Sequence, residues 1–273
     1  PGQIKKAAEM ITAAKKPVLY VGGGAIISGA AEEIQQLAVK AAAPVTTTLM
    51  GLGAFPESHE LSMKMLGMHG TWYANTAVME CDLLVNIGAR FDDRVTGNLD
   101  EFSQNSKKIH IDIDPSSMNK NVIVDLPIVG DVKHVLKQLI PLVERADTED
   151  WLKRINNWKQ EHPLTYDSTD SVHEEGLNGR DDQPVETPKK LPLRAQYVLE
   201  KVGEATKGEA YVVTDVGQHQ MWAAQWYGFN RPRTMITSGG LGTMGFGLPA
   251  GIGVQMAYPD ADVVVITDRK SVV

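Results

Sequence analysis

Cysteine is nearly absent from this sequence, which has one, Cys81, among 273 residues. A single thiol cannot form a disulfide within the chain, a usage typical of a reducing cytosol, and Cys81 is most simply a core residue. No apolar run approaches the roughly 20 residues that a membrane-spanning helix needs, and no signal-peptide pattern is present. We therefore expect a cytoplasmic protein with no membrane partner, or a plastid protein if the source is a plant or an alga.

Positive charge is also scarce. Lys and Arg number 27 against 34 Asp and Glu, which gives a net charge of −7. This balance argues against nucleic acid or an anionic membrane as the main partner, although it leaves room for a local basic pocket that binds phosphate. His and Cys do not cluster with metal-ligand spacing, and the G-x-S-x-G elbow of hydrolases is missing. The sequence therefore predicts no metal ligands within the chain.

What the sequence does contain is an alternation of short apolar runs and helical patterns. With 42% hydrophobic residues, the chain can bury a sizeable core. Continuous apolar strands separated by helices are typical of a parallel sheet with helices on both faces, so we expect an α/β fold. In the first half, strands are expected at 17–21, 44–49, 83–87, 108–113 and 126–129, and helices at 4–14, 30–40, 71–78 and 132–143.

A second α/β unit is expected after a polar linker. A charged helix at 151–161 precedes a stretch rich in Asp, Gly and Pro at 165–190, which we interpret as a partly disordered linker. Beyond it, helices are expected at 193–205, 218–226 and 247–257, and strands at 210–215, 234–237 and 263–266. The predicted division is one domain at 1–146, a helix and linker at 147–190, and the first part of a second domain at 191–267.

Two glycine-rich loops follow expected strands. Such turns let backbone N–H groups approach a phosphate closely, although a tight turn without a ligand explains the first loop equally well. The run Gly22-Gly23-Gly24 fails as a dinucleotide fingerprint, because Ile27 occupies the third glycine position and no acid ends the next strand. The stretch 240–245 does fit G-x-G-x-x-G, with Asp268 in place of the ribose-binding acid. A dinucleotide oxidoreductase or a non-catalytic nucleotide-binding module is therefore an alternative, weakened because this loop does not open its domain.

Charged side chains gather where several expected strands end, which is where ligands bind in parallel sheets. They are Arg90, Asp92, Asp93 and Arg94 after one strand, and Asp112 and Asp114 after the next. Arginine there suits a carboxylate or a phosphate, although a surface salt-bridge cluster is the simpler interpretation. Asp131 is more simply explained as a helix N-cap. Gly217, Gln218 and His219 open a helix that could face a phosphate, although a lone His there is more often a capping or core residue.

Taken together, these blocks resemble the large catalytic subunits of the acetolactate synthase family, also called acetohydroxyacid synthases, which are thiamine diphosphate enzymes of branched-chain amino acid synthesis. The resemblance covers nearly the whole chain except the linker and the last residues. It is carried by PVLYVGGGAI, TTTLMGLGAFP, MLGMHGTWYAN, GARFDDRVTGNL, HIDIDP, DVGQHQMWAAQWY and SGGLGTMGFGLPAGIG. Another thiamine enzyme of the same architecture, such as a glyoxylate carboligase or an oxidase, is a further alternative.

The resemblance implies that the first unit is the middle domain of a three-domain enzyme and binds FAD, which is largely structural in this family. The residues that it places along the flavin are Gly22, Gly23, Gly24, Thr48, Leu49, Leu66, Gly67, Met68, His69, Gly88, Arg90, Asp92, Arg94, Asp112, Ile113, Asp131 and Val132. Arg94 resembles the arginine that holds the carboxylate of the second 2-keto acid.

The second unit, by the same resemblance, is the start of the domain that binds thiamine diphosphate. The matching positions are Gly217, Gln218, His219, Gly242 and Met244, and the residues expected to take part in catalysis are Arg94, Gln218 and His219. The family decarboxylates pyruvate and condenses the resulting unit with pyruvate or 2-ketobutyrate. The whole enzyme is implied to be a homodimer or homotetramer with a regulatory small subunit.

Both ends of the sequence suggest an internal piece of a longer polypeptide. The chain lacks an initiator Met, and the family's Mg²⁺ ligands and activating glutamate would lie outside it. The stretch 268–273, DRKSVV, does not match the family's continuation. It can be encoded by a common sequencing-adapter strand, so we expect it to be an artefact. We also expect the chain alone to lack synthase activity.

Overall fold

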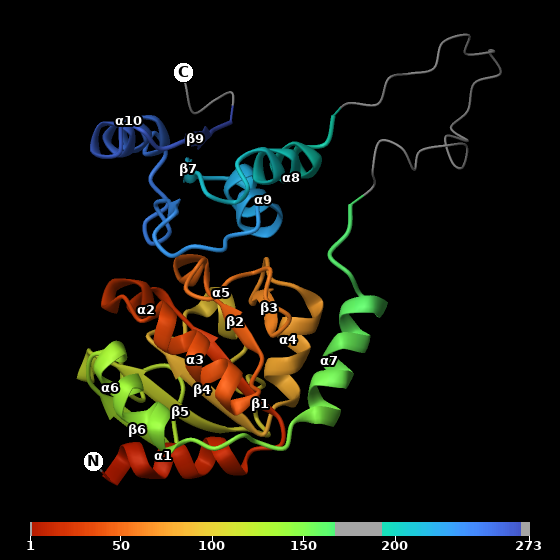
Figure 1. Ribbon diagram of the computed structural model, residues 1–273, viewed down its shortest axis with the longest axis vertical. Helices are drawn as coiled ribbons and strands as arrows, with labels where there is room; N and C mark the ends of the chain where they lie inside the picture. The colour runs from red at the N-terminus through yellow and green to blue at the C-terminus, as the bar shows by residue number, and fades with distance from the viewer. Residues whose placement is uncertain (1, 167–192, 269–273) are drawn as a thin grey trace, which may run out of the picture.

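The computed structural model describes residues 2–166 and 193–268, which form two α/β units (Figure 1). Most of the predicted linker and the last five residues of the predicted tail lie outside the described residues. The larger unit contains a six-stranded, fully parallel sheet with the strand order β3-β2-β1-β4-β5-β6. Its strands are β1 (Pro17–Val21), β2 (Val45–Thr47), β3 (Ser62–Met65), β4 (Leu83–Ile87), β5 (Lys107–Asp112) and β6 (Leu126–Val129). The predicted α/β class is confirmed.

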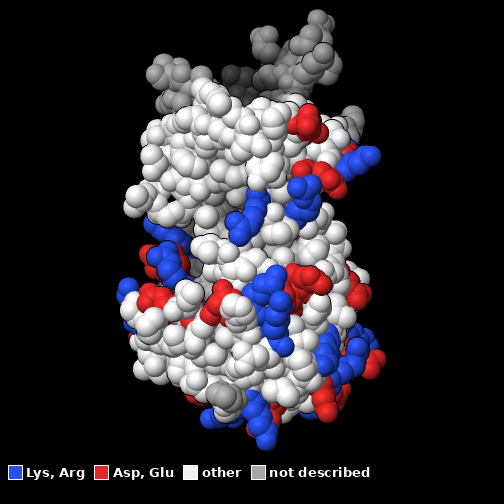
Figure 2. Space-filling view, turned by 60° about the vertical axis from the view of Figure 1, so that its left-hand side comes forward, with Lys and Arg blue, Asp and Glu red and all other residues white. Residues whose placement is uncertain are grey.

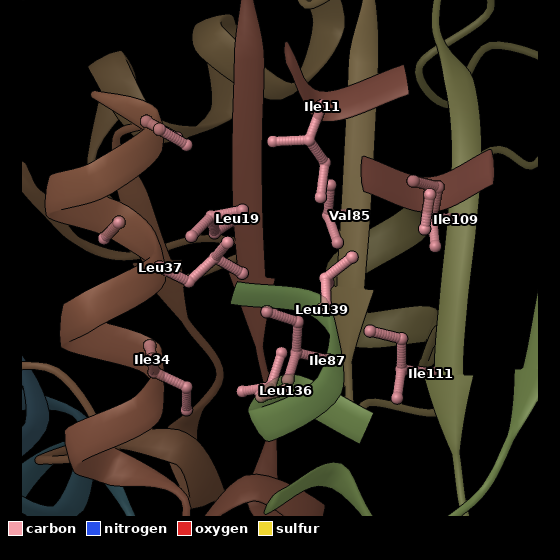
Figure 3. Close-up of a cluster of buried hydrophobic side chains, with 14 of the residues drawn as sticks. Ile11, Leu19, Ile34, Leu37, Val85, Ile87, Ile109, Ile111, Leu136 and Leu139 are labelled. Atoms are coloured by element: carbon pink, nitrogen blue, oxygen red, sulfur yellow. The ribbon is translucent and has the colours of Figure 1, made fainter. Parts of the chain in front are cut away.

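Helices cover both faces of this sheet, as the continuous apolar strands require. One face packs against α1 (Gly2–Ala13), α3 (Ala31–Ala41) and α6 (Val132–Leu139). Figure 3 shows the core between them, where Ile11, Leu37 and Leu139 meet the strands. All three are fully buried, so truncating any of them to Ala should cost about 2–5 kcal/mol. The opposite face packs against α4 (Trp72–Glu80) and α7 (Glu149–Glu161).

Local signals explain most of the element boundaries. The Thr71 hydroxyl accepts a hydrogen bond from Ala74 N–H at the start of α4, and Asp131 accepts one from His134 N–H at the start of α6. The helix predicted to reach residue 143 ends at Leu139 and continues only as a 3₁₀ turn, Ile140–Leu142. Pro141 contributes to this early end because it has no N–H with which to continue the α-helical hydrogen bonding, although Ile140 before it keeps helical dihedral angles (φ −53°, ψ −44°).

Four further expectations need correction. The strand expected at 44–49 is only Val45–Thr47, and the strand expected at 108–113 is Lys107–Asp112. The short strand β3 was not predicted, because Lys64 at its centre has a φ of 58° and the pairing with β2 shifts register there. The short helix α2 (Gly23–Ser28) was also missed, since three consecutive glycines indicate a turn rather than a helix.

The smaller unit has a three-stranded parallel sheet in the order β8-β7-β9. Its strands are β7 (Tyr211–Thr214), β8 (Met235–Ile236) and β9 (Val263–Ile266), and its helices are α8 (Ala195–Ala205), α9 (Gln218–Trp226) and α10 (Gly247–Ala257). Figure 2 shows that the surface of this unit on the drawn side carries few charges, whereas Lys, Arg, Asp and Glu gather at the junction and on the larger unit. Within the described residues, no helix has the length and apolarity needed to cross a membrane.

The two units pack directly on each other. Backbone and side-chain hydrogen bonds join the loop before β3 to the segment after α9, including Ser58 N–H to the Asn230 side chain at 3.0 Å. On the other side of the junction, the Arg233 guanidinium donates to the carbonyls of Ile26 and Ile27 at the end of α2. These contacts place the smaller unit over the edge of the large sheet at which the strands end (Figure 1).

Candidate functional site

A cavity of about 820 Å³ lies between the carboxyl edge of the large sheet and the smaller unit. Its volume falls within the roughly 300–1,000 Å³ that cofactor sites occupy, and its position is the one that parallel α/β sheets use for ligands. The larger unit provides most of the wall, from the loops after β1 to β5. The smaller unit contributes Gln220, Met221 and the loop 238–242.

The glycine turn after β1 forms one side of the cavity, and its backbone lies against the backbone of the loop after β4. Gly24 N–H donates to the Gly88 carbonyl at 2.9 Å, which draws the start of α2 against the loop after β4. A Cβ on Gly22 would lie 2.4 Å from the Gly88 oxygen, and one on Gly24 would lie 2.9 Å from the Gly88 Cα. Only glycine allows this crossing at positions 22 and 24, so these two glycines shape the wall rather than merely forming a loose turn.

Charged side chains occupy the part of the cavity near β4 and β5. Arg90 pairs with Asp92 at 3.2 Å, while the other oxygen of Asp92 accepts the backbone N–H of Arg94 and caps α5 (Asp93–Thr96). The Arg94 guanidinium makes no ion pair within the described ranges 2–166 and 193–268, so it remains available to an anion. Asp112 ends β5, and its carboxylate accepts the backbone N–H of Asp114 at 2.9 Å.

Asp114 is held as a carboxylate by its own loop. Hydrogen bonds from the Ser116 hydroxyl and the Ser116 backbone N–H lower the pKa of Asp114 below its usual value. Both Asp112 and Asp114 border the cavity. Carboxylates at this position can accept hydrogen bonds from ribose hydroxyls.

The remaining wall is apolar. Its side chains come from the loops after β1, β2, β3 and β5 and from the smaller unit, and they are Ile26, Ile27, Leu49, Met50, Met65, Leu66, Met68, Ile113, Met221 and Leu241. Several of them are unusually exposed for large hydrophobic residues, notably Ile27, Met68 and Leu241. A cavity with a charged end and a wide apolar part suits an amphiphilic ligand that has both phosphates and a flat ring.

The smaller unit holds its glycine loop by a buried carboxylate. Asp215, at the end of β7, accepts the Gly245 N–H at 2.9 and 3.1 Å from its two oxygens. Nearby, the Gln220 amide donates to the Thr237 hydroxyl at 2.6 Å, and Thr237 bonds to Thr214 at 2.7 Å. The cavity-lining loop 238–242 is thus anchored to β7 and α9.

The structure brings most of the predicted flavin residues together. The thirteen that line the cavity are Gly23, Gly24, Thr48, Leu49, Leu66, Met68, His69, Gly88, Arg90, Asp92, Arg94, Asp112 and Ile113. Gly22 and Gly67 lie directly beside lining residues, and Asn75 bonds to both the N–H and the carbonyl of Gly67. Asp131 and Val132 are not among the lining residues; Asp131 caps α6, and Val132 is buried in the core.

The predicted thiamine residues lie mostly outside this cavity. Gly242 borders it, whereas Gly217, Gln218, His219 and Met244 do not. The Nε2 atom of His219 is buried and has no hydrogen-bond partner among the described residues. Within those residues, no group of three or more His, Cys, Asp and Glu side chains is placed to hold a metal ion.

Sequence reasoning missed several lining residues. Met50, Ser238 and Gly239 belong to predicted motifs but gave no chemical signal of their own. Met221 is an apolar residue within an expected helix, and Tyr20 lies inside an apolar strand, so the sequence distinguishes neither of them from a core residue. The contribution of the smaller unit could have been anticipated only from tertiary packing.

Comparison with known protein families matches both units. Residues 4–139 match the thiamine pyrophosphate enzyme central domain, and residues 215–267 match the thiamine pyrophosphate enzyme C-terminal TPP binding domain. These matches do not describe a dinucleotide oxidoreductase, and the Gly245 N–H of the G-x-G-x-x-G stretch is already bound by Asp215.

Individual relatives of the chain are acetolactate synthase large subunits. The sequence is 47% identical over 277 residues to an acetolactate synthase large subunit of Haemophilus influenzae, covering 99% of this chain and 45% of the relative. It is 44% identical to the acetolactate synthase isozyme 3 large subunit of Escherichia coli, in a match that covers 99% of this chain and 45% of the relative. It is 46% identical to an acetolactate synthase large subunit of Cyanidium caldarium, in a match that covers 98% of this chain and 43% of the relative. The chain therefore spans less than half the length of these relatives.

Proposed function

Because the chain belongs to the thiamine pyrophosphate enzyme family, we propose that it forms the flavin domain and part of the thiamine domain of an acetolactate synthase large subunit. The proposed limits are 1–146 for the flavin domain and 191–267 for the thiamine part. The whole protein would decarboxylate pyruvate and condense the resulting two-carbon unit with a second pyruvate or with 2-ketobutyrate. The observation that carries this proposal is the cavity, whose wall includes thirteen of the seventeen residues expected along a flavin.

The residues present fit FAD. Gly23 and Gly24 leave room for a pyrophosphate beside their backbone, and Arg90 provides positive charge near it. Asp112 and Asp114 suit the hydroxyls of the adenosine ribose, while Leu66 and Met68 offer an apolar surface to the ring system.

The residues of the smaller unit fit one side of a thiamine diphosphate site. His219 presents a buried ring nitrogen that has no hydrogen-bond partner among the described residues, and the Gly245 end of the loop from 242 to 245 is held by Asp215. When bound, thiamine diphosphate supplies the electron sink for loss of CO₂ from a 2-keto acid. The Mg²⁺ that accompanies it would be held by residues other than those described.

Arg94 is the proposed anchor for the carboxylate of the acceptor 2-keto acid. Its guanidinium makes no ion pair with a described residue, and the Met68 N–H donates to its backbone carbonyl at 2.9 Å, which fixes the loop that carries it. A planar fork of donors suits a carboxylate and would hold the acceptor in one orientation. We further propose a cytoplasmic enzyme that assembles as a homodimer or homotetramer with a regulatory small subunit.

The direct test is flavin retention. The purified chain is incubated with FAD, freed of unbound ligand by gel filtration and scanned for flavin absorbance. The proposal predicts about one retained FAD per chain and no retention of NAD in a parallel sample. Absence of any FAD affinity in folded protein would refute the assignment. For the whole protein, Arg94→Met should raise the KM for the 2-keto acid acceptor far more than Arg94→Lys.

A further inference from the structure

Asn86 is a fully buried polar residue in β4, a strand whose other four residues are apolar. Its carboxamide bonds to both backbone groups of one residue. Ala89 N–H donates to its Oδ1 at 3.0 Å, and its Nδ2 donates to the Ala89 carbonyl at 2.9 Å. Burying an amide is unfavourable unless it is hydrogen-bonded, and here a donor and the acceptor are both used. Asn86 therefore fixes the peptide groups on both sides of Ala89, where the chain leaves the sheet.

His110 contacts the same backbone carbonyl from the neighbouring strand. It lies opposite Asn86 in the parallel register of β4 and β5, and it is also fully buried. Its Nε2 is 3.0 Å from the Ala89 carbonyl oxygen, which can only accept, so Nε2 carries the proton. Burial lowers the pKa of His110, partly opposed by Asp112, and this favours the neutral ring. The Ala89 carbonyl is thus held by two buried donors from two strands.

The turn that begins at Ala89 forms a large part of the cavity wall. Six lining residues lie within 88–95, and Arg90 is among them. Phe91 is buried with a φ of 53°, a conformation that is rare for a residue other than glycine and persists only where the surroundings hold it. Asn121 holds the outer side by donating to the Phe91 carbonyl at 2.9 Å. The inner side is held by the two buried side chains described above.

The position of Arg90 depends mainly on the backbone that carries it. Its side chain is 73% exposed, and its guanidinium pairs with Asp92 at 3.2 Å on the same turn. Asn86 and His110 do not line the cavity. Any effect that they have on a ligand must therefore be transmitted through this turn.

We propose that Asn86, together with His110, is a positioning residue that holds the Ala89 turn so that Arg90 meets the phosphates of the ligand in this cavity. The inference rests on the proposed function, which makes this ligand FAD. Arginine binds phosphate through a planar fork of donors, and such a contact is sensitive to orientation. Loss of the buried bonds should displace the guanidinium and weaken FAD binding through Arg90, in addition to lowering stability.

The test is an FAD titration of the wild type, Asn86→Leu, Arg90→Met and the double variant, each below its own melting temperature. Arg90→Met should raise Kd about tenfold, the lower range for a charge-assisted hydrogen bond. Asn86→Leu should raise Kd about 3- to 10-fold. Adding Asn86→Leu to Arg90→Met should raise it by less than about twofold more, because the two residues act as one unit. The melting temperature should fall whenever Asn86 is replaced, since the Ala89 N–H then loses its partner.

Thr148→Val is the matched control for a purely structural role. Thr148 is 3% exposed, its hydroxyl donates to the Ala42 carbonyl at 2.8 Å, and it does not line the cavity. This variant also removes a buried bond from a side chain to the backbone, so it should lower the melting temperature and keep the wild-type Kd. If Asn86→Leu behaves in the same way, the positioning role is overturned.

His110→Leu is the milder second variant, since it removes one donor and keeps both bonds of Asn86. It should raise Kd about 2- to 5-fold, again only when Arg90 is present, and it decides the matter if Asn86→Leu does not fold. A wild-type chain that binds no FAD would overturn both the inference and the proposed function. If the wild type binds FAD but these variants raise Kd by the same factor with and without Arg90, only the inference is overturned.

Discussion

Glu57 and Phe229 form a reciprocal hydrogen-bonded pair across the junction of the two units. Glu57 N–H donates to the Phe229 carbonyl at 3.1 Å, and Phe229 N–H donates to the Glu57 carboxylate at 3.0 Å. The second carboxylate oxygen of Glu57 is buried and has no partner among the described residues. The junction that closes the cavity thus contains a carboxyl group that is poorly solvated when charged.

The first prediction concerns pH. Burial raises the pKa of Glu57 from 4.5 to about 7, partly opposed by Lys64 and by the bond from Phe229. A group whose pKa is higher in the folded state stabilises the fold fully below its unfolded pKa and loses that contribution as pH rises through its folded pKa. As pH rises from 4.5 through about 7, ionisation of Glu57 should therefore lower the unfolding free energy progressively, by roughly 3 kcal/mol in all.

Glu57→Gln should remove this dependence. Denaturant unfolding at pH 5 and pH 8 should show a smaller difference for the variant than for wild type, with the variant the more stable protein at pH 8. An equal pH dependence in both proteins would contradict the assignment of the titrating group to Glu57.

The second prediction concerns the glycine turn. A methyl group on Gly24 would lie 2.9 Å from the Gly88 Cα and 3.0 Å from the Gly88 oxygen, both backbone atoms that cannot rotate away. Gly24→Ala should therefore destabilise the chain by about 1–3 kcal/mol and weaken FAD binding. Gly253→Ala is the control, since nothing lies within 4 Å of the added Cβ in helix α10. It should stabilise the chain by about 0.5–1 kcal/mol and leave FAD binding unchanged.

The third prediction concerns the buried carboxylate behind the glycine loop of the smaller unit. Asp215 is 1% exposed and accepts the Gly245 N–H with both oxygens. Asp215→Asn weakens this charge-assisted contact and should lower the unfolding free energy by about 1–3 kcal/mol. Asp262→Asn, at an exposed position in the same unit, should change it by less than about 0.5 kcal/mol. Equal effects of the two variants in denaturant unfolding would show that Asp215 does not hold the loop.

Much of the fold could be predicted because its signals are local. The apolar strand at 17–21 and the helices at 218–226 and 247–257 were predicted with their observed limits, since a continuous apolar run marks the strand and glycines stand at the start of both helices. Strand β3 was not predicted, because its pairing depends on an irregular register with β2 and not on its own composition. Pro141 is a helix-ending residue that is visible in the sequence, and it indicates a helix shorter than the one predicted at 132–143.

The part of the site that could be predicted is the part made of charged residues and glycines, because these residue types indicate ligand binding by themselves. Arginines, aspartates and glycines at strand ends indicated one ligand-binding edge, and the family resemblance indicated a flavin. The part played by the smaller unit was not predictable, because it depends on packing between segments far apart in the chain.

The most direct measurement is an FAD titration of three proteins: wild type, Leu241→Asp and Leu248→Asp. Leu241 is 95% exposed and lines the cavity from the smaller unit, whereas Leu248 is 53% exposed and lies on α10 away from it. A flavin site closed by both units predicts that wild type and Leu248→Asp bind FAD alike, while Leu241→Asp binds it roughly tenfold more weakly at unchanged stability. Equal Kd values for all three proteins, or no FAD binding by the wild-type chain, would contradict it.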